Sequence, residues 1–387
     1  MKAASAMETM PRFDLSPAEC EGFEAIRRIA QAHQPAAGEA LPRAALRTLF
    51  GALAPTGYLA STLARSEGGH GLSPLAFGVL VESLAPELTL LGNHSVQRYL
   101  ADFGSASLKE RHLPSLLDGS GIGAIAITEA HAGSDLAAMQ TRVRRSGRVH
   151  RLSGRKTWVT HGMFATLFVV LARSGDDGSG FTRFIVPAGT PGLSVRPLNP
   201  IGLRHLSFAE VTFDDCELGD ESRLGDEGRG SEGTKTAFPL ARALAALQSL
   251  RIAEAALDAA HAYAAERQIL GTPLSRRELV QDGHVRLATG ADALRLLAYR
   301  VLSDHSRPEA LRSASAVKAA AADLSLDACR WSGEVMGSQA LDEDAPINAL
   351  TRDAQMMSVV DGTSVLNRLV VARRTVGAPR PARKPSA

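Results

Sequence analysis

The clearest helical pattern in the chain is Leu240-Ala-Arg-Ala-Leu-Ala-Ala-Leu-Gln-Ser-Leu-Arg-Ile-Ala-Glu-Ala-Ala-Leu257. Its leucines, together with Ala253, recur at steps of three and four residues, so they share one face of a helix. Similar patterns extend from about 279 to 301, from Val317 to Val335, and from about 345 to 375. Four amphipathic helices joined by short connections predict an antiparallel bundle.

The region before this bundle has the pattern of a β-sheet. Its short β-branched or aromatic runs, at residues 166–171, 181–186 and 209–213, are separated by Gly, Asp, Ser and Pro. Such spacing is typical of an antiparallel barrel or sandwich. No long helical patterns stand between the runs, which disfavours a doubly wound parallel sheet.

The N-terminal region, from about 16 to 117, is helical again. Leu46, Leu49 and Leu53 follow helical spacing, Gly68-Gly-His-Gly71 marks a loop, and Pro74 opens the next helix. The predicted fold class is therefore α+β. We expect an N-terminal all-α domain (1–121), a central antiparallel β-barrel or sandwich domain (122–233) and a C-terminal four-helix bundle (234–387).

Composition excludes several classes of protein. Of 387 residues, 45% are hydrophobic and 22% charged, which is ordinary for a globular chain and excludes disorder. The formal net charge of +2 leaves no basic footprint for nucleic acid. The three cysteines, Cys20, Cys216 and Cys329, are widely separated. We expect reduced thiols, with neither a disulfide framework nor a metal site.

Targeting signals are missing from the sequence pattern. No apolar run approaches the roughly 18 residues of a membrane span. Residues 1–13 lack the apolar segment of a secretory signal. We therefore expect a cytoplasmic protein that does not enter membranes.

Two glycine-rich stretches do not qualify as nucleotide-binding loops. Gly119-Ser-Gly-Ile-Gly123 precedes a strand where a dinucleotide fingerprint needs a helix, so we expect a turn. Residues 225–233 lack the Lys-Ser/Thr pair of a phosphate loop, so we expect a mobile connection.

Four other segments stand in a definite order along the chain. They are Ala126-Ile-Thr-Glu-Ala-His-Ala-Gly-Ser-Asp-Leu136; Gly154-Arg-Lys-Thr-Trp-Val-Thr-His-Gly162; Glu266-Arg-Gln-Ile-Leu-Gly-Thr-Pro-Leu274; and Glu334-Val-Met-Gly337 with Arg352-Asp353 and Val360-Asp-Gly-Thr-Ser364. Together they resemble the acyl-CoA dehydrogenase family of flavoproteins in order and spacing. The resemblance covers nearly the whole chain and implies the same α–β–α plan.

The first two segments imply the flavin side of an FAD site. By the resemblance, Thr128 and Thr160 supply hydroxyls and Trp158 an aromatic face to the flavin ring. Ser134, after Gly133, would meet the pyrophosphate. The alternative is that the two threonines and the tryptophan are ordinary strand residues and that Ser134 belongs to an ordinary turn.

The third and fourth segments imply the rest of the cofactor site. Arg267 would reach the FAD diphosphate of a neighbouring subunit as a guanidinium fork; the alternative is a solvated arginine at a helix end. Further cofactor contacts are implied for Glu334, Gly337, Ser338 and Thr363. Glu334 and Ser338 replace the family's usual Gln and Gly at the adenosine end.

Asp361 stands where the family usually has a glutamate base before Gly-Thr. Oxidation of an acyl thioester removes the α proton, and a buried carboxylate with a raised pKa can accept that proton. In some relatives the base precedes an arginine of the first bundle helix, but here Ala241 precedes Arg242. The alternatives are that Asp361 caps a turn before Gly362 or that catalysis has been lost.

The substrate is expected to meet Arg242 and Gly362 near the base. His94, Gln97 and Arg98 lie where the family's acyl pocket is usually apolar, so they line a pocket for a polar or branched acyl group or belong to a helix surface. His131 stands where the family has a small residue beside the flavin loop.

The resemblance implies an FAD-dependent dehydrogenase that α,β-desaturates an acyl thioester, with Asp361 as base. The thioester is carried by CoA or by an acyl carrier protein, as in the carrier-protein dehydrogenases of natural-product pathways. Electrons leave to an external acceptor, and the protein is a homo-oligomer, dimer or tetramer. The alternatives are a superfamily oxidase of the nitroalkane-oxidase type, which also uses Asp, and a flavin-binding protein without turnover.

Overall fold

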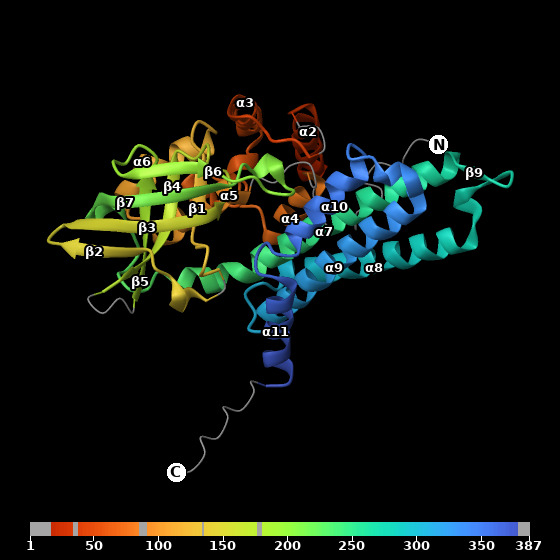
Figure 1. Ribbon diagram of the computed structural model, residues 1–387. Coiled ribbons are helices and arrows are strands. Elements are labelled where there is room, and N and C mark those ends of the chain that lie inside the picture. The colour runs from red at the N-terminus through yellow and green to blue at the C-terminus, as the bar shows by residue number, and fades with distance from the viewer. Residues whose placement is uncertain (1–16, 34–37, 85–90, 134, 176–179, 378–387) are drawn as a thin grey trace, which may run out of the picture. The chain divides into compact units, whose positions relative to one another are not determined.

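The computed structural model describes residues 17–33, 38–84, 91–133, 135–175 and 180–377 (Figure 1). The chain divides into two compact units, Met1–Thr236 and Ala237–Ala387. The first unit contains the N-terminal helices and the β-sheet, and the second contains the C-terminal helices.

The N-terminal helices of the first unit are α2 (Pro17–His33), α3 (Arg43–Leu53), α4 (Pro74–Leu84), α5 (Leu91–Phe103) and α6 (Ala106–Leu117). The predicted face of Leu46, Leu49 and Leu53 is fully buried on α3, and α4 begins at Pro74 as expected. Both predictions are confirmed.

The first unit also contains one eight-stranded sheet. Its strands are β1 (Gly123–Ala126), β2 (Arg142–Ser146), β3 (Val149–Val159), β4 (Leu167–Ser174), β5 (Gly180–Pro187), β6 (Leu193–Pro197), β7 (Ala209–Gly219) and β8 (Arg223–Leu224). The order is β6-β7-β3-β2-β4-β5-β8, and β1 pairs with β4. The described strands form an open path from β6 to β8, so the expectation of a barrel is corrected: the sheet is not closed. It is also not wholly antiparallel, because β1 and β2 both run parallel to β4.

Strand β4 is buried on both faces. Phe168, Val170 and Ala172 point into the sheet's own core. Leu167 and Val169 point to the other face, where they pack with Val96 and Leu100 of α5 and with residues of α6. Coverage on both faces explains why this strand is a continuous apolar run with no polar alternation.

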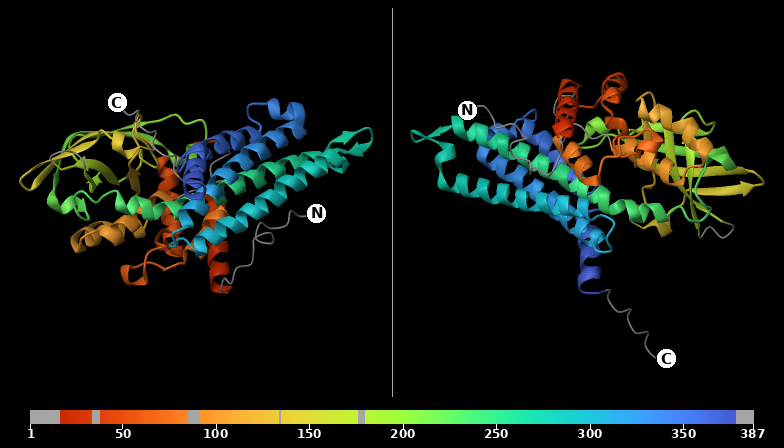
Figure 2. Two further views of the ribbon diagram at one scale, coloured as in Figure 1. Left: turned by 90° about the horizontal axis from the view of Figure 1, so that it is seen from below. Right: turned by 180° about the vertical axis from the view of Figure 1, so that it is seen from behind.

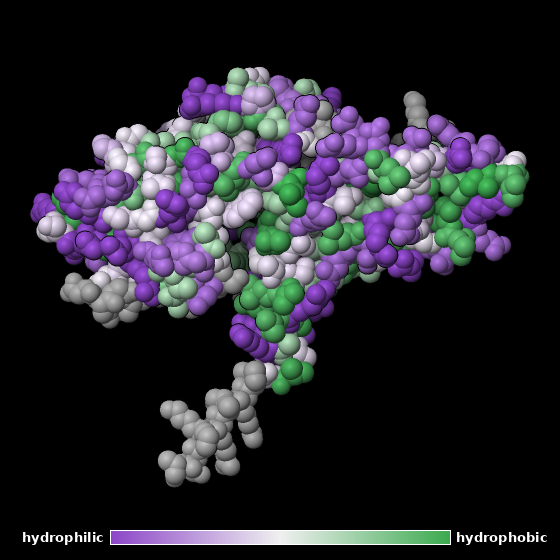
Figure 3. Space-filling view, viewed as in Figure 1, coloured by the Kyte–Doolittle hydropathy of each residue, from purple (hydrophilic) through white to green (hydrophobic). Residues whose placement is uncertain are grey.

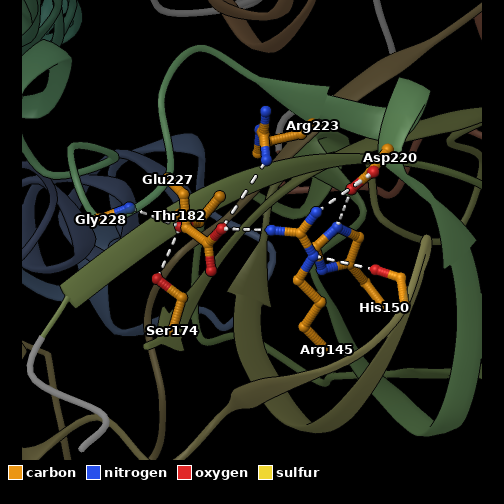
Figure 4. A network of polar contacts seen from close by, with 9 residues as sticks. Arg145, His150, Ser174, Thr182, Asp220, Arg223, Glu227 and Gly228 are labelled. Atoms are coloured by element: carbon orange, nitrogen blue, oxygen red, sulfur yellow. Dashed lines mark hydrogen bonds and ion pairs between the residues drawn. The ribbon is translucent and has the colours of Figure 1, made fainter. Parts of the chain in front are cut away.

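A polar network fastens the chain after β7 to the sheet (Figure 4). Asp220 accepts a 2.6 Å hydrogen bond from His150 and pairs with Arg145 at 3.5 Å. Arg145 also pairs with Glu227 at 3.5 Å, and the Gly228 N–H donates to Thr182 Oγ1 at 2.9 Å. The Gly230 N–H adds a bond to the Phe181 carbonyl at 2.6 Å. The expectation of a mobile connection is therefore wrong for 225–230.

The second unit is a bundle whose long helices lie side by side (Figures 1 and 2). Its helices are α7 (Glu232–Glu266), which begins in the first unit, α8 (Glu278–Ser303), α9 (Ala310–Met336), α10 (Pro346–Met357) and α11 (Ser364–Thr375). Ala253, Leu257, Leu287 and Ala328 join α7, α8 and α9 in one core. The hairpin of β9 (Gln268–Ile269) and β10 (Thr272–Pro273) follows α7.

The predicted fourth helix is two helices. The segment expected from 345 to 375 breaks between α10 and α11. Asp361 and Gly362 have φ of 53° and 91°, in the left-handed region that cannot continue a right-handed helix. The break places the expected catalytic aspartate in a connection, not within a helix.

Some apolar side chains of the second unit remain exposed. Figure 3 shows apolar surface over α11 and around the β9–β10 hairpin. The residues are Val365 and Leu369 on α11, Val376 directly after it, and Ile269 and Leu270 in the hairpin. None of the described helices has the length and apolarity that crossing a membrane requires.

Candidate active site

The Asp361 connection, which joins α10 to α11, has a hydrogen-bonded main chain and a carboxylate that no described residue binds. Thr363, not Asp361, is the N-cap of α11, since its Oγ1 accepts a 3.1 Å bond from the Leu366 N–H. The Asn367 side-chain amide donates to the Gly362 and Thr363 carbonyls at 2.8 and 3.1 Å. Among the described residues, the Asp361 carboxylate makes neither a hydrogen bond nor an ion pair. It therefore does not serve as a turn cap.

Arg242 and Gly362, both expected as substrate contacts, lie beside Asp361. Arg242, on α7, is 4% exposed and donates through Nε to the Asp361 main-chain carbonyl at 3.3 Å. Its Nη1 donates to Ser315 Oγ of α9 at 2.7 Å. A Cβ on Gly362 would lie 3.7 Å from Arg242 Nη2 and 3.1 Å from Leu366, so the space beside the base is narrow.

Lys318 of α9 is the residue of this group that sequence reasoning missed. Its side chain is fully buried, and its ammonium donates to the Gly362 carbonyl at 2.7 Å and to the Ser358 carbonyl at 3.3 Å. A signal existed, because Lys318 lies four residues after Ala314 and four before Ala322, both fully buried. A lysine on the buried face of a helix needs a partner inside the protein.

The electrostatics suit a general base. Burial raises the pKa of Asp361 above its usual value, and the Lys318 and Arg242 cations only partly offset this. Burial also lowers the pKa of Lys318 to about 8, against the attraction of Asp361. A carboxylate with a raised pKa and no partner among the described residues is a stronger proton acceptor than an ordinary surface aspartate.

In the first unit, Thr128 and Trp158 are held together by the main chain. The Thr157 N–H donates to the Thr128 carbonyl at 2.9 Å. Trp158 is 48% exposed at the end of β3 and has φ of 57°. Its ring lies 5.8 Å from that of Phe208, between centroids. Thr160 is half-buried just beyond it.

A buried ion pair, Lys156 with Glu129, lies next to Thr128 in the sequence and in the structure. Lys156 is fully buried and donates to Glu129 Oε1 and to the Ile127 carbonyl, both at 2.9 Å. Glu129 also accepts the N–H groups of Gln140 at 2.7 Å and Thr141 at 2.9 Å. The pair therefore closes the loop between β1 and β2, next to Thr128. Sequence reasoning missed this role, although strand alternation places Lys156 on the same face as buried Leu152.

The electrostatic surroundings of Glu129 differ from those of Asp361. Burial raises the pKa of Glu129, but hydrogen bonds from Thr141, Gln140 and Lys156 outweigh burial, so the pKa lies below its usual value. Lys156 has its pKa lowered to about 8 by burial. His131 lies 3.3 Å from the same carboxylate and is exposed.

The residues of the first unit fit a flavin. A large indole left half-exposed at a strand end, in a backbone conformation that few bulky residues adopt, offers a flat apolar surface to an aromatic ligand. The half-buried Thr128 and Thr160 supply donors nearby. Ser134, expected at the pyrophosphate, lies outside the described residues.

The other expected cofactor contacts lie at element ends of the second unit. Arg267 follows α7 with an exposed side chain and, among the described residues, no ion pair. Glu334 is exposed and lies 3.8 Å from Arg330. Gly337 ends α9 with φ of 58°, and Ser338 follows it, exposed. None of these side chains is committed to a core, so each is accessible to a ligand.

His94 and Gln97 are buried on α5 and are not a helix surface. His94 Nε2 lies 2.8 Å from the Tyr58 carbonyl and 3.2 Å from Ser61 Oγ. Gln97 donates to the Leu116 carbonyl at 3.1 Å, while its side-chain oxygen is buried without a hydrogen bond.

Among the described residues, no cluster of His, Cys, Asp and Glu suits a metal.

The chain matches three family models in succession. They are the N-terminal, middle and C-terminal domains of acyl-CoA dehydrogenase, over residues 19–120, 124–216 and 228–376. Together these models span most of the chain, in the order helices, sheet, helices that the structure shows.

Similar proteins carry related names. Benzylmalonyl-CoA dehydrogenase of Aromatoleum aromaticum is 33% identical over 341 residues, covering 86% of this chain and 90% of that protein. Human short-chain specific acyl-CoA dehydrogenase is 31% identical and covers 82% and 79%. The structure of glutaryl-CoA dehydrogenase from Mycobacterium smegmatis has a TM-score of 0.84 at 26% identity, over 95% and 96% of the two chains. The chain therefore belongs to the acyl-CoA dehydrogenase family of flavin-dependent oxidoreductases.

Proposed function

We propose that this protein desaturates an acyl thioester between its α and β carbons, with FAD as non-covalent cofactor and Asp361 as base. The observation that carries the proposal is the Asp361 carboxylate. Burial desolvates this carboxylate and raises its pKa. No described residue makes a hydrogen bond or an ion pair to it, whereas Arg242 and Lys318 hold the main-chain carbonyls of residues 361 and 362.

In this proposal, separate residues of the chain accept the proton, contact the substrate and bind FAD. Asp361 accepts the α proton through its carboxylate, and Arg242 and Gly362 border the reacting thioester. Thr128, Trp158, Thr160 and Ser134 hold FAD, with Arg267, Glu334, Gly337, Ser338 and Thr363 at its diphosphate and adenosine parts. When bound, FAD supplies the two-electron acceptor for the hydride that leaves the β carbon.

The carrier of the acyl group is CoA or an acyl carrier protein. The names of the relatives, benzylmalonyl-CoA dehydrogenase and short-chain specific acyl-CoA dehydrogenase, support a CoA thioester. The segments Asp135-Leu-Ala-Ala-Met and Val186-Pro-Ala-Gly-Thr support a carrier protein through their likeness to carrier-protein dehydrogenases. His94 and Gln97, as buried polar residues, support a substituted or polar acyl group. Electrons then pass to an external acceptor in the cytoplasm.

A panel of thioesters tests this function. The purified yellow protein is mixed without oxygen with matched acyl-CoA and acyl-carrier-protein thioesters, and flavin absorbance is followed. We expect bleaching with at least one member. If every saturated thioester leaves the flavin oxidised while dithionite reduces it, the proposal is wrong.

The aspartate also leaves a second candidate, an oxidase of the nitroalkane-oxidase type. Such an enzyme would be bleached by a nitroalkane in place of a thioester, and its reduced flavin would react quickly with oxygen. Stopped-flow mixing of dithionite-reduced protein with oxygenated buffer separates the two reaction classes.

Arg267→Ala is expected to weaken FAD binding. In this proposal the exposed guanidinium bonds the diphosphate, and a hydrogen bond to a charged group contributes about 1.5–3 kcal/mol, or roughly 10- to 100-fold in affinity. Titration of apoprotein with FAD measures the loss. The matched control is Arg276→Ala, which removes another exposed arginine of the same unit and should bind FAD normally.

The Arg267 assignment also implies a homo-oligomer, dimer or tetramer, because the diphosphate it meets belongs to a neighbouring subunit. A monomeric mass by light scattering at micromolar concentration, in a protein that retains FAD, contradicts this assignment.

A further inference from the structure

Lys318 is buried beneath the Asp361 connection and contacts it on both sides. Its two hydrogen-bond acceptors, the carbonyls of Ser358 and Gly362, belong to residues before and after Asp361. An ammonium without water needs such acceptors, since burial of an unpaired charge is costly. The ammonium therefore binds the main chain on both sides of Asp361 in the sequence, at the Ser358 carbonyl (3.3 Å) and at the Gly362 carbonyl (2.7 Å).

Arg242 supplies a third attachment from another helix. It binds the Asp361 carbonyl itself and is held by Ser315, which lies one turn before Lys318 on α9. Two cations from α7 and α9 thus hold the carbonyls of residues 358, 361 and 362. None of these bonds uses the Asp361 side chain.

The connection needs this support, because Asp361 and Gly362 are both left-handed, with φ of 53° and 91°. A residue with a Cβ adopts that conformation at a cost and keeps it only where its surroundings impose it. The bonds from Lys318 and Arg242 are charge-assisted and therefore among the stronger hydrogen bonds of proteins.

The charge of Lys318 acts on the carboxylate as well as on the main chain. The charged groups that face Lys318 are Asp361, Arg242 and Asp323, and Asp323 is already paired with Arg368. Lys318 opposes the rise in the pKa of Asp361 that burial causes. Without this cation, the carboxyl group would hold its proton to a higher pH.

We infer that Lys318 is a positioning residue for the proposed reaction: its hydrogen bonds to the Ser358 and Gly362 carbonyls fix the left-handed turn that aims the Asp361 carboxylate, and its positive charge favours the ionised form of that carboxylate. The kinetic part of this inference rests on the proposed function. The part that concerns the turn does not.

Two substitutions separate the contacts from the charge. Lys318→Met removes both, whereas Lys318→Gln removes the charge but keeps a donor. In the FAD-loaded protein without substrate, we expect amide exchange over 358–367 to rise at least about tenfold in the Met variant and less in the Gln variant. In single-turnover flavin reduction, the acid limb of the pH profile should move up by about half a unit or more in both variants.

The matched control is Arg312→Met, which removes an exposed cation from the same helix. It should change neither the exchange over 358–367 nor the acid limb. The inference is overturned if a variant of Lys318 that binds FAD normally keeps the wild-type acid limb and the wild-type exchange. If no thioester reduces the wild-type protein, the proposed function fails, and the exchange measurement alone still judges whether Lys318 fixes the turn.

Discussion

Asp361→Asn is expected to bind FAD normally and to be reduced by thioester at least about 10²-fold more slowly than the wild type, the usual scale for loss of a general base. Asn is the substitution that preserves the turn best, because it tolerates the left-handed region as well as Asp does. For the wild type, the rate should fall as pH falls through the raised pKa of Asp361, since the base must be ionised. Stopped-flow absorbance measures both effects.

Asp361→Glu tests how the acyl pocket is adapted to the aspartate side chain, which is one methylene shorter than glutamate. If the site is only a shortened form of the family's, the variant should still desaturate straight-chain thioesters. A pocket rebuilt for a bulky or polar acyl group should lose activity instead. Wild-type reduction of Asp361→Asn would contradict the assignment of the base, and Glu129 would not replace it, because its carboxylate is fully occupied.

Lys156→Met is expected to lower stability by about 3–5 kcal/mol, because it leaves the buried carboxylate of Glu129 without its cation. The loop that carries Thr128 should loosen with it, so FAD content should fall too. Thermal unfolding followed by tryptophan fluorescence, and FAD content after gel filtration, measure the two losses.

A neighbouring residue provides the control. Arg155→Met removes an exposed cation that lies 3.7 Å from Glu210 and should cost less than about 1 kcal/mol. The double variant Glu129→Gln with Lys156→Met should recover part of the stability, because it removes both charges. Equal stability of Lys156→Met and Arg155→Met would show that the buried pair contributes nothing.

Much of the fold was predictable because it depends on local patterns. The leucine face of α3, the proline that opens α4 and the apolar run of β4 each follow from periodicity or from one residue's geometry. The segment from 345 to 375 was predicted as one helix, with a turn at Asp361-Gly362 only as an alternative, because the break depends on tertiary contacts such as those of Lys318 and Arg242. The openness of the sheet depends on long-range pairing, which no local signal fixes.

The proposed site was predictable where the motif carries its own chemistry. Asp361 is proposed as the base from its likeness to the family's glutamate, and Arg242 as a substrate contact from its place on the first bundle helix. Lys318 and Lys156 were missed because each lies far along the chain from the carboxylate it serves. Both interrupt an otherwise buried face, and a charged residue in such a place signals an internal partner.

The hydrogen bonds around position 361 have a consequence for evolution. Lys318 and Arg242 donate hydrogen bonds to main-chain carbonyls, which every amino acid provides, so these bonds do not depend on which acidic side chain stands at position 361. A lineage can therefore exchange one acid for another at this position without rebuilding the surrounding helices. A single substitution at this position can therefore change how far the carboxylate extends from the main chain, and with it which acyl groups the enzyme accepts.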